Sequence, residues 1–189
     1  LNERYSFMSK QIEDLVKAKE DLTKIIEQID KTMSTQFGLA FDKIKVYFND
    51  IFKRLFGGGN AKLILTNKED ILSSGIEIEV EPPDKKPQSL AVLSGGERTL
   101  TVIALLFAFF TYNPAPFSVL DEIDAPLDEA NVKRFAKFLK DYAKRTQFIL
   151  VTHRKGTMES ADVMYGVTIE DAGVSKLISV RLEDFEERG

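Results

Sequence analysis

A narrow apolar stripe in the first 36 residues restricts what this part of the chain can fold into. Apolar residues recur there in alternating steps of four and three, with one charged interruption at Lys19. The stripe consists of Met8, Ile12, Leu15, Leu22, Ile26, Ile29 and Met33. This spacing lines them up along one seam of a helix, as in a coiled coil. Because the flanks are charged and no Gly or Pro occurs before Gly38, we predict an unbroken coiled-coil arm over residues 1–36.

A seam this narrow needs a second helix to cover it. No other heptad segment exists among the 189 residues, so the partner helix has to come from outside this sequence. An amphipathic helix that packs on its own domain is the simpler alternative. The chain opens on Leu1 rather than Met, and we expect it to be a segment of a longer protein.

Beyond residue 36 the apolar face widens and becomes aromatic, which is typical of a helix that enters a globular core. Its members are Phe37, Phe41, Ile44, Tyr47, Phe48, Ile51, Phe52 and Leu55. We therefore predict a second domain over residues 37–189. The triple glycine Gly57–Gly59 should end the helix. It is not a phosphate-binding P-loop, because no Gly-Lys-Ser/Thr follows at the required spacing.

The remaining pattern alternates strands and helices, which indicates an α/β fold. The predicted order is strands over 61–66 and 75–80, a polar loop over 82–87, a helix over 95–112, a strand over 117–120, a helix over 129–144, a strand over 147–152, a short helix over 156–161, and a hairpin of 163–170 and 174–182 around 171–173. The helix over 95–112 is apolar nearly all round, so we expect it to be buried centrally.

Composition excludes several kinds of site. The chain has no cysteine, so it can form neither a disulfide nor a thiolate metal site. Its net charge of −4 gives no global basic surface for nucleic acid. The net charge does not exclude a local basic patch. The longest apolar run, Val102–Phe110, is far below the ~20 residues that span a bilayer. No signal peptide is evident at the charged N-terminus.

The stretch from Leu93 to Glu97 predicts a helix start that can receive an anion. Ser94 can cap the helix, and Glu97 lies three residues on, where a capping box requires it. Gly95 and Gly96 would let ligand oxygens approach the backbone, and the positive end of the helix dipole favours phosphate. A plain capping box with flexible glycines is the alternative.

Polar side chains follow two predicted strands where each strand ends. Asp121 and Glu122 come after Phe117–Leu120, and His153 comes after the strand that ends at Thr152. Asp121 suits Mg²⁺ held through water, Glu122 can act on an attacking water, and His153 can donate to a γ-phosphate. The glycine loop with its lysine is missing, so this would be half of a nucleotide site. A strand emerging into solvent and a structural histidine are the alternatives.

Three strings together resemble the C-terminal half of an SMC head, the ATPase domain of structural-maintenance-of-chromosomes proteins in the ABC superfamily. Leu93–Glu97 resembles the signature motif, Phe117–Asp128 the Walker B motif with its D-loop, and Val151–Arg154 the switch histidine. Asp-Glu-Ile-Asp-Ala, at residues 121–125, differs from the Asp-Glu-Pro-Thr of ABC transporters. The likeness covers the whole chain, because the heptads resemble a returning coiled-coil arm, and residues 124–132 are bacterial in character.

This resemblance implies a mostly parallel sheet flanked by helices, with a terminal hairpin and an antiparallel coiled-coil stub. It also implies ATP and Mg²⁺ as cofactors. Glu122 would be the catalytic base, His153 the γ-phosphate sensor and Asp121 the metal residue. Leu93, Ser94, Gly95, Gly96 and Glu97 would contact ATP held by the opposite head, while Asp124 and Asp128 would face that head.

The implied partners are an N-terminal lobe of the same protein, a second head, a kleisin subunit and DNA, with no membrane. The kleisin's winged helix would dock at the hairpin region over 163–182, and DNA near Lys43, Lys45, Lys53 and Arg54, although these basic residues also fit a solvated helix face. The implied setting is the cytoplasm, on the chromosome. A double-strand-break repair ATPase and a decayed coiled-coil module are the rival interpretations. Asp-Glu-Ile-Asp-Ala argues against the first, and the intact motif residues argue against the second.

Overall fold

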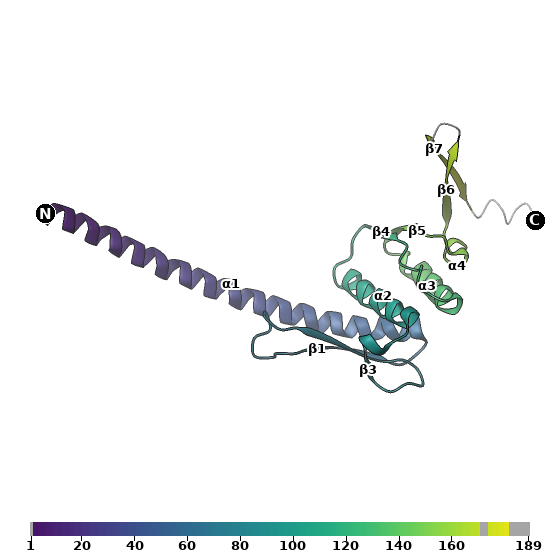
Figure 1. Ribbon diagram of the computed structural model, residues 1–189, viewed down its shortest axis with the longest axis horizontal. Coiled ribbons are helices and arrows are strands. Elements are labelled where there is room, and N and C mark those ends of the chain that lie inside the picture. Colours follow the sequence, from purple (N-terminus) through teal and green to yellow (C-terminus); the bar gives the residue numbers. More distant parts are fainter. Residues whose placement is uncertain (1, 171–173, 182–189) are drawn as a thin grey trace, which may run out of the picture. The chain divides into compact units, whose positions relative to one another are not determined.

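A computed structural model describes residues 2–170 and 174–181, and the chain forms two compact units. The first unit holds the chain up to Lys43 together with Leu65–Ile76, and the second holds Ile44–Ile64 together with the chain from Glu77 on. Helix α1 (Asn2–Phe56) is continuous through the boundary (Figure 1). The division predicted between residues 36 and 37 falls inside this helix and stays a prediction.

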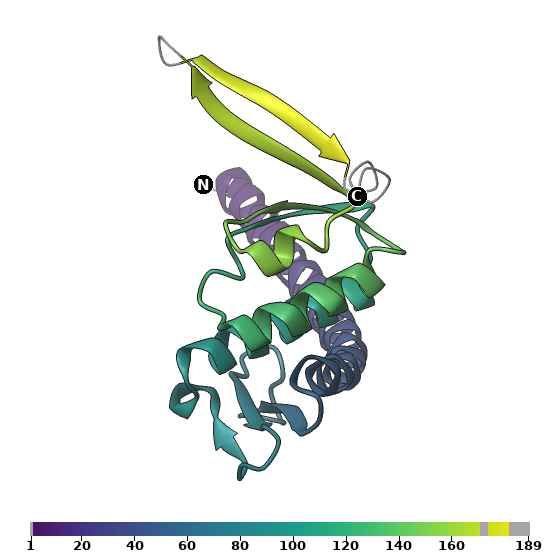
Figure 2. The same cartoon turned by 90° about the vertical axis from the view of Figure 1, so that its right-hand side faces the viewer.

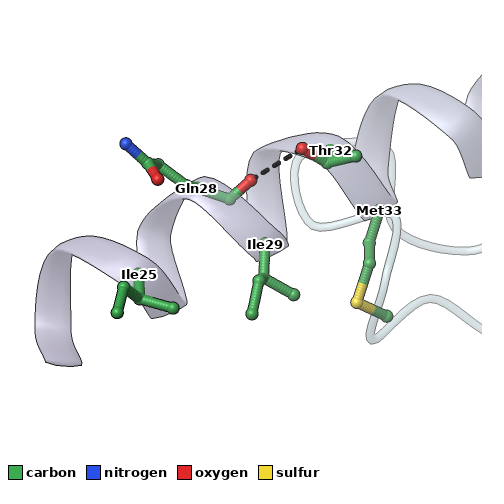
Figure 3. A pocket seen from close by; sticks show the side chains of 5 residues that line it. All are labelled: Ile25, Gln28, Ile29, Thr32 and Met33. Atoms are coloured by element: carbon green, nitrogen blue, oxygen red, sulfur yellow. Dashed lines mark hydrogen bonds between the residues drawn. The ribbon is translucent and has the colours of Figure 1, made fainter.

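The first unit carries the apolar stripe of α1 on its surface. Every member of the predicted stripe is at least half exposed. Figure 3 shows Ile25, Ile29 and Met33 on the same side of the helix, while the Thr32 hydroxyl donates to the Gln28 carbonyl at 2.8 Å. A helix with an uncovered apolar seam is what the coiled-coil interpretation requires of a chain that lacks its partner helix.

The C-terminal part of α1 enters the core of the second unit, as its aromatic face predicted. Phe48, Phe52 and Leu55 are fully buried, and the rings of Phe52 and Phe56 stack with centroids 4.0 Å apart. The helix ends at Phe56 because three glycines with positive φ follow. A Cβ at Gly59 would lie 2.2 Å from the Glu81 carbonyl oxygen, so only glycine fits there. The predicted helix stop is confirmed.

A three-stranded sheet follows in the order β1 (Asn60–Leu65), β2 (Ile76–Glu81) and β3 (Gln88–Ser89). β2 and β3 pair antiparallel, with Glu79 opposite Ser89. The sheet is tied to α1 by the Ala61 amide, which donates to the Asn49 side chain at 3.0 Å. β3 and the short 3-10 helix η1 (Leu90–Val92) were not predicted, because elements of two or three residues carry no periodicity.

Two helices and two parallel strands position the motifs. They are α2 (Gly95–Tyr112), β4 (Phe117–Asp121), α3 (Glu129–Tyr142) and β5 (Gln147–Val151). β4 and β5 run parallel from the pair Phe117 and Gln147 to the pair Asp121 and Val151. Among the described residues, β2 and β3 pair antiparallel, and so do β6 (Val163–Glu170) and β7 (Val174–Arg181).

Aromatic side chains pack the helices onto one face of this parallel pair. Phe107 of α2 is fully buried. Its ring lies 5.0 Å from those of Phe138 and Tyr142 on α3, and 5.6 Å from that of Phe148 on β5. The Tyr142 hydroxyl shares a 2.9 Å hydrogen bond with Thr111 of α2. This cluster is the junction of α2, α3 and β5.

The opposite face of the parallel pair is open, and so is one side of α2. The exposed side chains on the strands are Phe117, Val119, Ile149 and Val151. On α2, Val102 is 50% exposed and Phe109 is 49% exposed. The predicted central burial of this helix therefore holds on one side and not on the other, because the described residues supply packing partners on one side only.

The chain continues through α4 (Lys155–Met158) into a hairpin of β6 (Val163–Glu170) and β7 (Val174–Arg181). Val163 pairs with Arg181 and Glu170 with Val174, and the two strands lie side by side in Figure 2. The turn predicted at 171–173 lies outside the described residues. Among the described helices, none is long and apolar enough to span a bilayer.

Candidate functional site

The N-terminus of α2 is held by a reciprocal capping box. Ser94 is the N-cap, and its Oγ accepts a hydrogen bond from the Glu97 amide at 3.4 Å. The Glu97 carboxylate in turn accepts from the Ser94 amide at 3.3 Å and from the Ser94 hydroxyl at 2.8 Å. This geometry confirms the capping box and satisfies two backbone donors at the helix start.

Lys85 completes this arrangement from the polar loop that precedes the motif. Its ammonium lies 2.7 Å from Glu97 Oε1, and it holds the pKa of the Glu97 carboxyl below its ordinary value, with help from the hydrogen bonds of Ser94. The sequence predicted only a surface loop there. A lysine 12 residues before a glutamate carries no local signal that the two side chains meet.

The two glycines of the motif have different surroundings. A Cβ at Gly95 would meet nothing within 4 Å, so the helix start is open for a ligand on that side. A Cβ at Gly96 would instead make ordinary contacts of 3.7 Å with Pro126, Asp128 and Asn131, so α2 begins beside the loop after β4. Leu93 is buried and anchors the motif in the core.

The strand-end residues meet at one edge of the parallel pair. Asp121 is the exposed last residue of β4, opposite Val151. The Glu122 amide donates to the Val151 carbonyl at 2.9 Å, while its φ of 46° lies in the left-handed region, unusual for a residue other than glycine. Glu122 Oε1 lies 3.8 Å from His153 Nδ1, and both side chains are about two-thirds exposed. That separation is too long for a direct hydrogen bond.

The two further acids of the loop after β4 are engaged inside the chain. Asp128 is the N-cap of α3, as predicted, and its carboxylate accepts from the Asn131 amide at 2.8 Å and from the Asn131 side chain at 2.9 Å. Asp124 is only 2% exposed. Its carboxylate accepts hydrogen bonds from the hydroxyls of Thr152 and Thr157, two residues that the sequence did not single out. That Asp124 and Asp128 face a second head stays a prediction.

The structure thus gathers the motif residues into two groups. One group is the start of α2 with the Asp128 loop, and the other is the edge with Asp121, Glu122 and His153. Within the described part of the chain, no hydrogen bond or ion pair joins Ser94 to Glu122 or to His153. Each group therefore presents its polar side chains independently.

The donor set fits Mg²⁺ and ATP only in part. Among the described residues, no group of three His, Asp or Glu side chains is arranged to hold a metal by itself. Asp121 offers an exposed hard oxygen ligand, and Mg²⁺ commonly uses one or two carboxylates together with waters and substrate phosphates. The open space at Gly95 suits a phosphate at a helix N-terminus.

Comparison with known proteins assigns the family. The family model of the RecF/RecN/SMC N terminal domain matches residues 4–176. The chain is 56% identical over 187 residues to the chromosome partition protein Smc of Bacillus subtilis (strain 168), and 53% identical over 184 residues to that of Halothermothrix orenii. These matches cover 99% and 97% of this chain but only 16% of each relative, so the chain spans about a sixth of their length.

Solved structures agree with this assignment. A chain solved in work on ATP-driven dimerization and DNA stimulated activation of SMC ATPases is 43% identical, with a TM-score of 0.74 over 82% of this chain and 93% of that one. The SmcHead bound to the C-winged helix domain of ScpA is 44% identical (TM-score 0.75, covering 83% of this chain and 48% of that one). The Pyrococcus furiosus Smc head with an extended coiled coil, bound to the C-terminal domain of ScpA, is 42% identical (TM-score 0.77, covering 99% and 47%). This chain, with its signature-like helix start and its strand-end acids, therefore belongs to the RecF/RecN/SMC family and corresponds to the C-terminal half of an SMC head.

Proposed function

We propose that this chain supplies half of a composite ATPase site. Together with an N-terminal lobe that carries the P-loop, it binds ATP with Mg²⁺, dimerises with a second head around two ATP molecules, and hydrolyses them. The cycle drives chromosome condensation and segregation. The chain alone is not expected to hydrolyse ATP.

The observation that carries this proposal is the meeting of Asp121, Glu122 and His153 at one edge of the parallel pair. Glu122 is the general base for the attacking water, His153 contacts the γ-phosphate, and Asp121 helps to hold Mg²⁺, which would neutralise charge on the phosphates. The left-handed backbone at Glu122 supports the assignment, since strained conformations of non-glycine residues cluster at functional sites.

The separation of the two groups supports a role in trans for the signature motif. Among the described residues, the Ser94 side chain forms hydrogen bonds only with Glu97, and the position beside Gly95 is open. The start of α2 is thus free to receive the γ-phosphate of ATP bound to the other head. Because this contact would exist only in the dimer, nucleotide binding and dimerisation would be thermodynamically linked.

The open face of the β4–β5 pair and the open side of α2 support the proposed N-terminal lobe as a partner. Several large apolar side chains in sequence-distant elements remain about half exposed there. Apolar surface of this kind is typical of an interface rather than of a monomer's exterior. The uncovered stripe of α1 fits the returning helix of an antiparallel coiled coil.

A kleisin and DNA complete the proposed assembly. One related head is bound to the C-winged helix domain of ScpA and another to the C-terminal domain of ScpA. The hairpin of β6 and β7 is our candidate for the equivalent surface here. Its exposed side chains include Tyr165, Val167, Leu177 and Ile178. DNA would lie near Lys43, Lys45, Lys53 and Arg54, and the complex would be located on the chromosome in the cytoplasm.

Two variants of an intact head test the proposal. Glu122→Gln should still bind ATP, hydrolyse it at least about 100-fold more slowly, and accumulate as a dimer in analytical ultracentrifugation. Ser94→Arg should bind ATP as a monomer and fail to dimerise, because the larger side chain fills the space beside the helix start. Hydrolysis by Glu122→Gln at the wild-type rate, or normal dimerisation of Ser94→Arg, would refute the respective role.

A further inference from the structure

A buried carboxylate lies in the loop between the two strand ends. Asp124 comes two residues after Glu122 and is only 2% exposed. One of its oxygens, Oδ2, accepts a hydrogen bond from Thr152 Oγ1 at 2.7 Å and another from Thr157 Oγ1. A buried carboxylate is costly unless it is well hydrogen-bonded, and none of the ion pairs among the described residues includes Asp124. The burial of Asp124 therefore indicates that its carboxylate has a role besides packing.

The two threonines hold the segment that carries His153. Thr152 immediately precedes the histidine, and its Oγ1 also accepts a hydrogen bond from the Arg154 amide at 3.0 Å. The Thr152 hydroxyl thus accepts from the residue after His153 and donates to Asp124. Thr157 is buried in α4, and its amide donates to the Arg154 carbonyl at 3.1 Å. Both hydroxyls fix the turn around His153 to the same oxygen.

The same carboxylate belongs to the turn that carries Glu122. The Ala125 amide donates to the Glu122 carbonyl at 3.1 Å, and the Leu127 amide donates to the Asp124 carbonyl at 3.0 Å. The backbone of this turn is therefore closed on both sides of Asp124. A path of hydrogen bonds leads from the Glu122 turn through Asp124 to the His153 turn.

Packing limits the movement of the second turn. A Cβ at Gly156 would lie 2.9 Å from Val132 Cγ1, so α4 is seated directly on α3. With α4 fixed in this way, the bond from Thr157 to Asp124 sets where the Glu122 turn lies. The bond from Thr152 then sets the position of His153 itself.

We propose that Asp124 is a positioning residue for hydrolysis, which fixes Glu122 relative to His153 through the hydroxyls of Thr152 and Thr157. This inference rests on the proposed function of Glu122 and His153. It gives the Asp124 side chain a role within its own head. A carboxylate suits the role because its hydrogen bonds are stronger than those of a neutral acceptor.

Matched variants at Thr157 test the inference in the full-length protein with both lobes present. Thr157→Val keeps the shape of the side chain but removes the hydroxyl, whereas Thr157→Ser keeps the hydroxyl. We expect Thr157→Val to lower kcat about 10- to 100-fold with a change in KM for ATP of less than about two-fold, because small misplacement of catalytic groups affects the chemical step. Thr157→Ser should retain at least about half of the wild-type kcat.

At Thr152 we expect the same order: Thr152→Val should lower kcat more than Thr152→Ser. Rates are normalised to the amount of head that binds ATP, so that a loss of folded protein does not count as a loss of kcat. If Thr157→Val fails to fold, Asp124→Asn replaces it, since an amide oxygen can accept both hydroxyls without the charge. Asp124→Asn should lower kcat by less than the loss expected for Thr157→Val, and it should leave the KM for ATP unchanged.

Three outcomes would overturn the inference. They are an unchanged kcat per ATP-binding head in the valine variants, an equal loss in the serine variants, or a rise of KM in place of the fall of kcat. Wild-type and Glu122→Gln proteins are measured in parallel. A Glu122→Gln head as active as wild type would refute the proposed base and the positioning role with it. An inactive Glu122→Gln head beside fully active valine variants would refute the positioning role alone.

Discussion

The two faces of the β4–β5 pair are built from similar residues but have opposite environments. On one face, Phe148 packs against Phe107 and Tyr142 in a continuous aromatic cluster. On the other face, Phe117 is 56% exposed and Val119 is 58% exposed. Both faces are apolar, although the described residues cover only one of them. In a sheet buried on both faces, strands read as continuous apolar runs, and β4 and β5 read in this way.

This sequence therefore encodes a core larger than the described residues complete. The covered face explains why the strand ends are well placed, because α2 and α3 fix β4 and β5 from one side. Glu122 and His153 lie just beyond the ends of β4 and β5, and their side chains are about two-thirds exposed. We infer that the missing cover and the missing half of the nucleotide site come from the same partner.

Removing a ring from the covered face should destabilise the fold most. Phe107→Ala should lower the free energy of unfolding by about 3–5 kcal/mol, because a fully buried ring at the centre of the cluster is removed. Urea denaturation of the chain measures this loss. The matched control is Phe117→Ala on the open face, which should cost less than about 1 kcal/mol in the chain alone. Equal costs at the two positions would contradict the distinction between the faces.

A charge on the open face should weaken binding of the partner lobe and leave the fold of this chain unchanged. Val119→Asp places a carboxylate on the exposed surface of β4, so this chain should fold normally. Its affinity for the N-terminal lobe should fall at least about 30-fold, or about 2 kcal/mol, because the charge would be buried without a partner. Calorimetric titration of the two lobes measures the change. An unchanged affinity would show that the lobe does not cover this face.

A smaller effect is expected at Glu122, where the open face ends. Its φ of 46° favours glycine, so Glu122→Gly should unfold at higher urea than Glu122→Ala, with a difference of about 1 kcal/mol. Neither variant should hydrolyse ATP in the intact head. A more stable alanine variant would show that the left-handed backbone does not strain the strand end.

The smallest effect on stability is expected at the N-terminal cap of α2, one of the helices that pack on the covered face. Lys85 depresses the pKa of Glu97, so this contribution to stability is present above the ordinary value of 4.5 and is lost as the pH falls through the lower folded value. Lys85→Met should weaken folding at pH 7 by about 0.5–1 kcal/mol, since the ammonium is half exposed and screened. The difference between the two proteins should shrink below pH 4.5. Unfolding curves measured from pH 7 to pH 3 check this, and a difference that grows on acidification would contradict it.

Much of the covered side could be predicted from the sequence. The capping box at Ser94 and the glycine stop after Phe56 depend on residues within a few positions of each other, and both are confirmed. Apolar runs predicted elements over 95–112, 117–120 and 147–152, and α2, β4 and β5 agree with these bounds to within one residue. Local patterns of this kind need no knowledge of tertiary contacts.

The contacts that position the site could not be predicted in this way. Thr157 meets Asp124 across 33 residues, and Lys85 meets Glu97 across 12. Neither pair has a periodic or motif signal, because only the tertiary fold brings the side chains together. The expected central burial of α2 holds on one side of the helix only, because its apolar residues go nearly all round while the described residues cover a single side.

ATP hydrolysis, measured across a range of protein concentrations, shows whether this chain is half of a composite site. The chain is assayed alone and after co-expression with a matching N-terminal lobe. We predict no hydrolysis by the chain alone, and hydrolysis with the lobe that rises faster than linearly with concentration, because two heads must meet. Hydrolysis by the chain alone, or a strictly linear dependence with the lobe, would show that the site is not completed by the lobe and a second head.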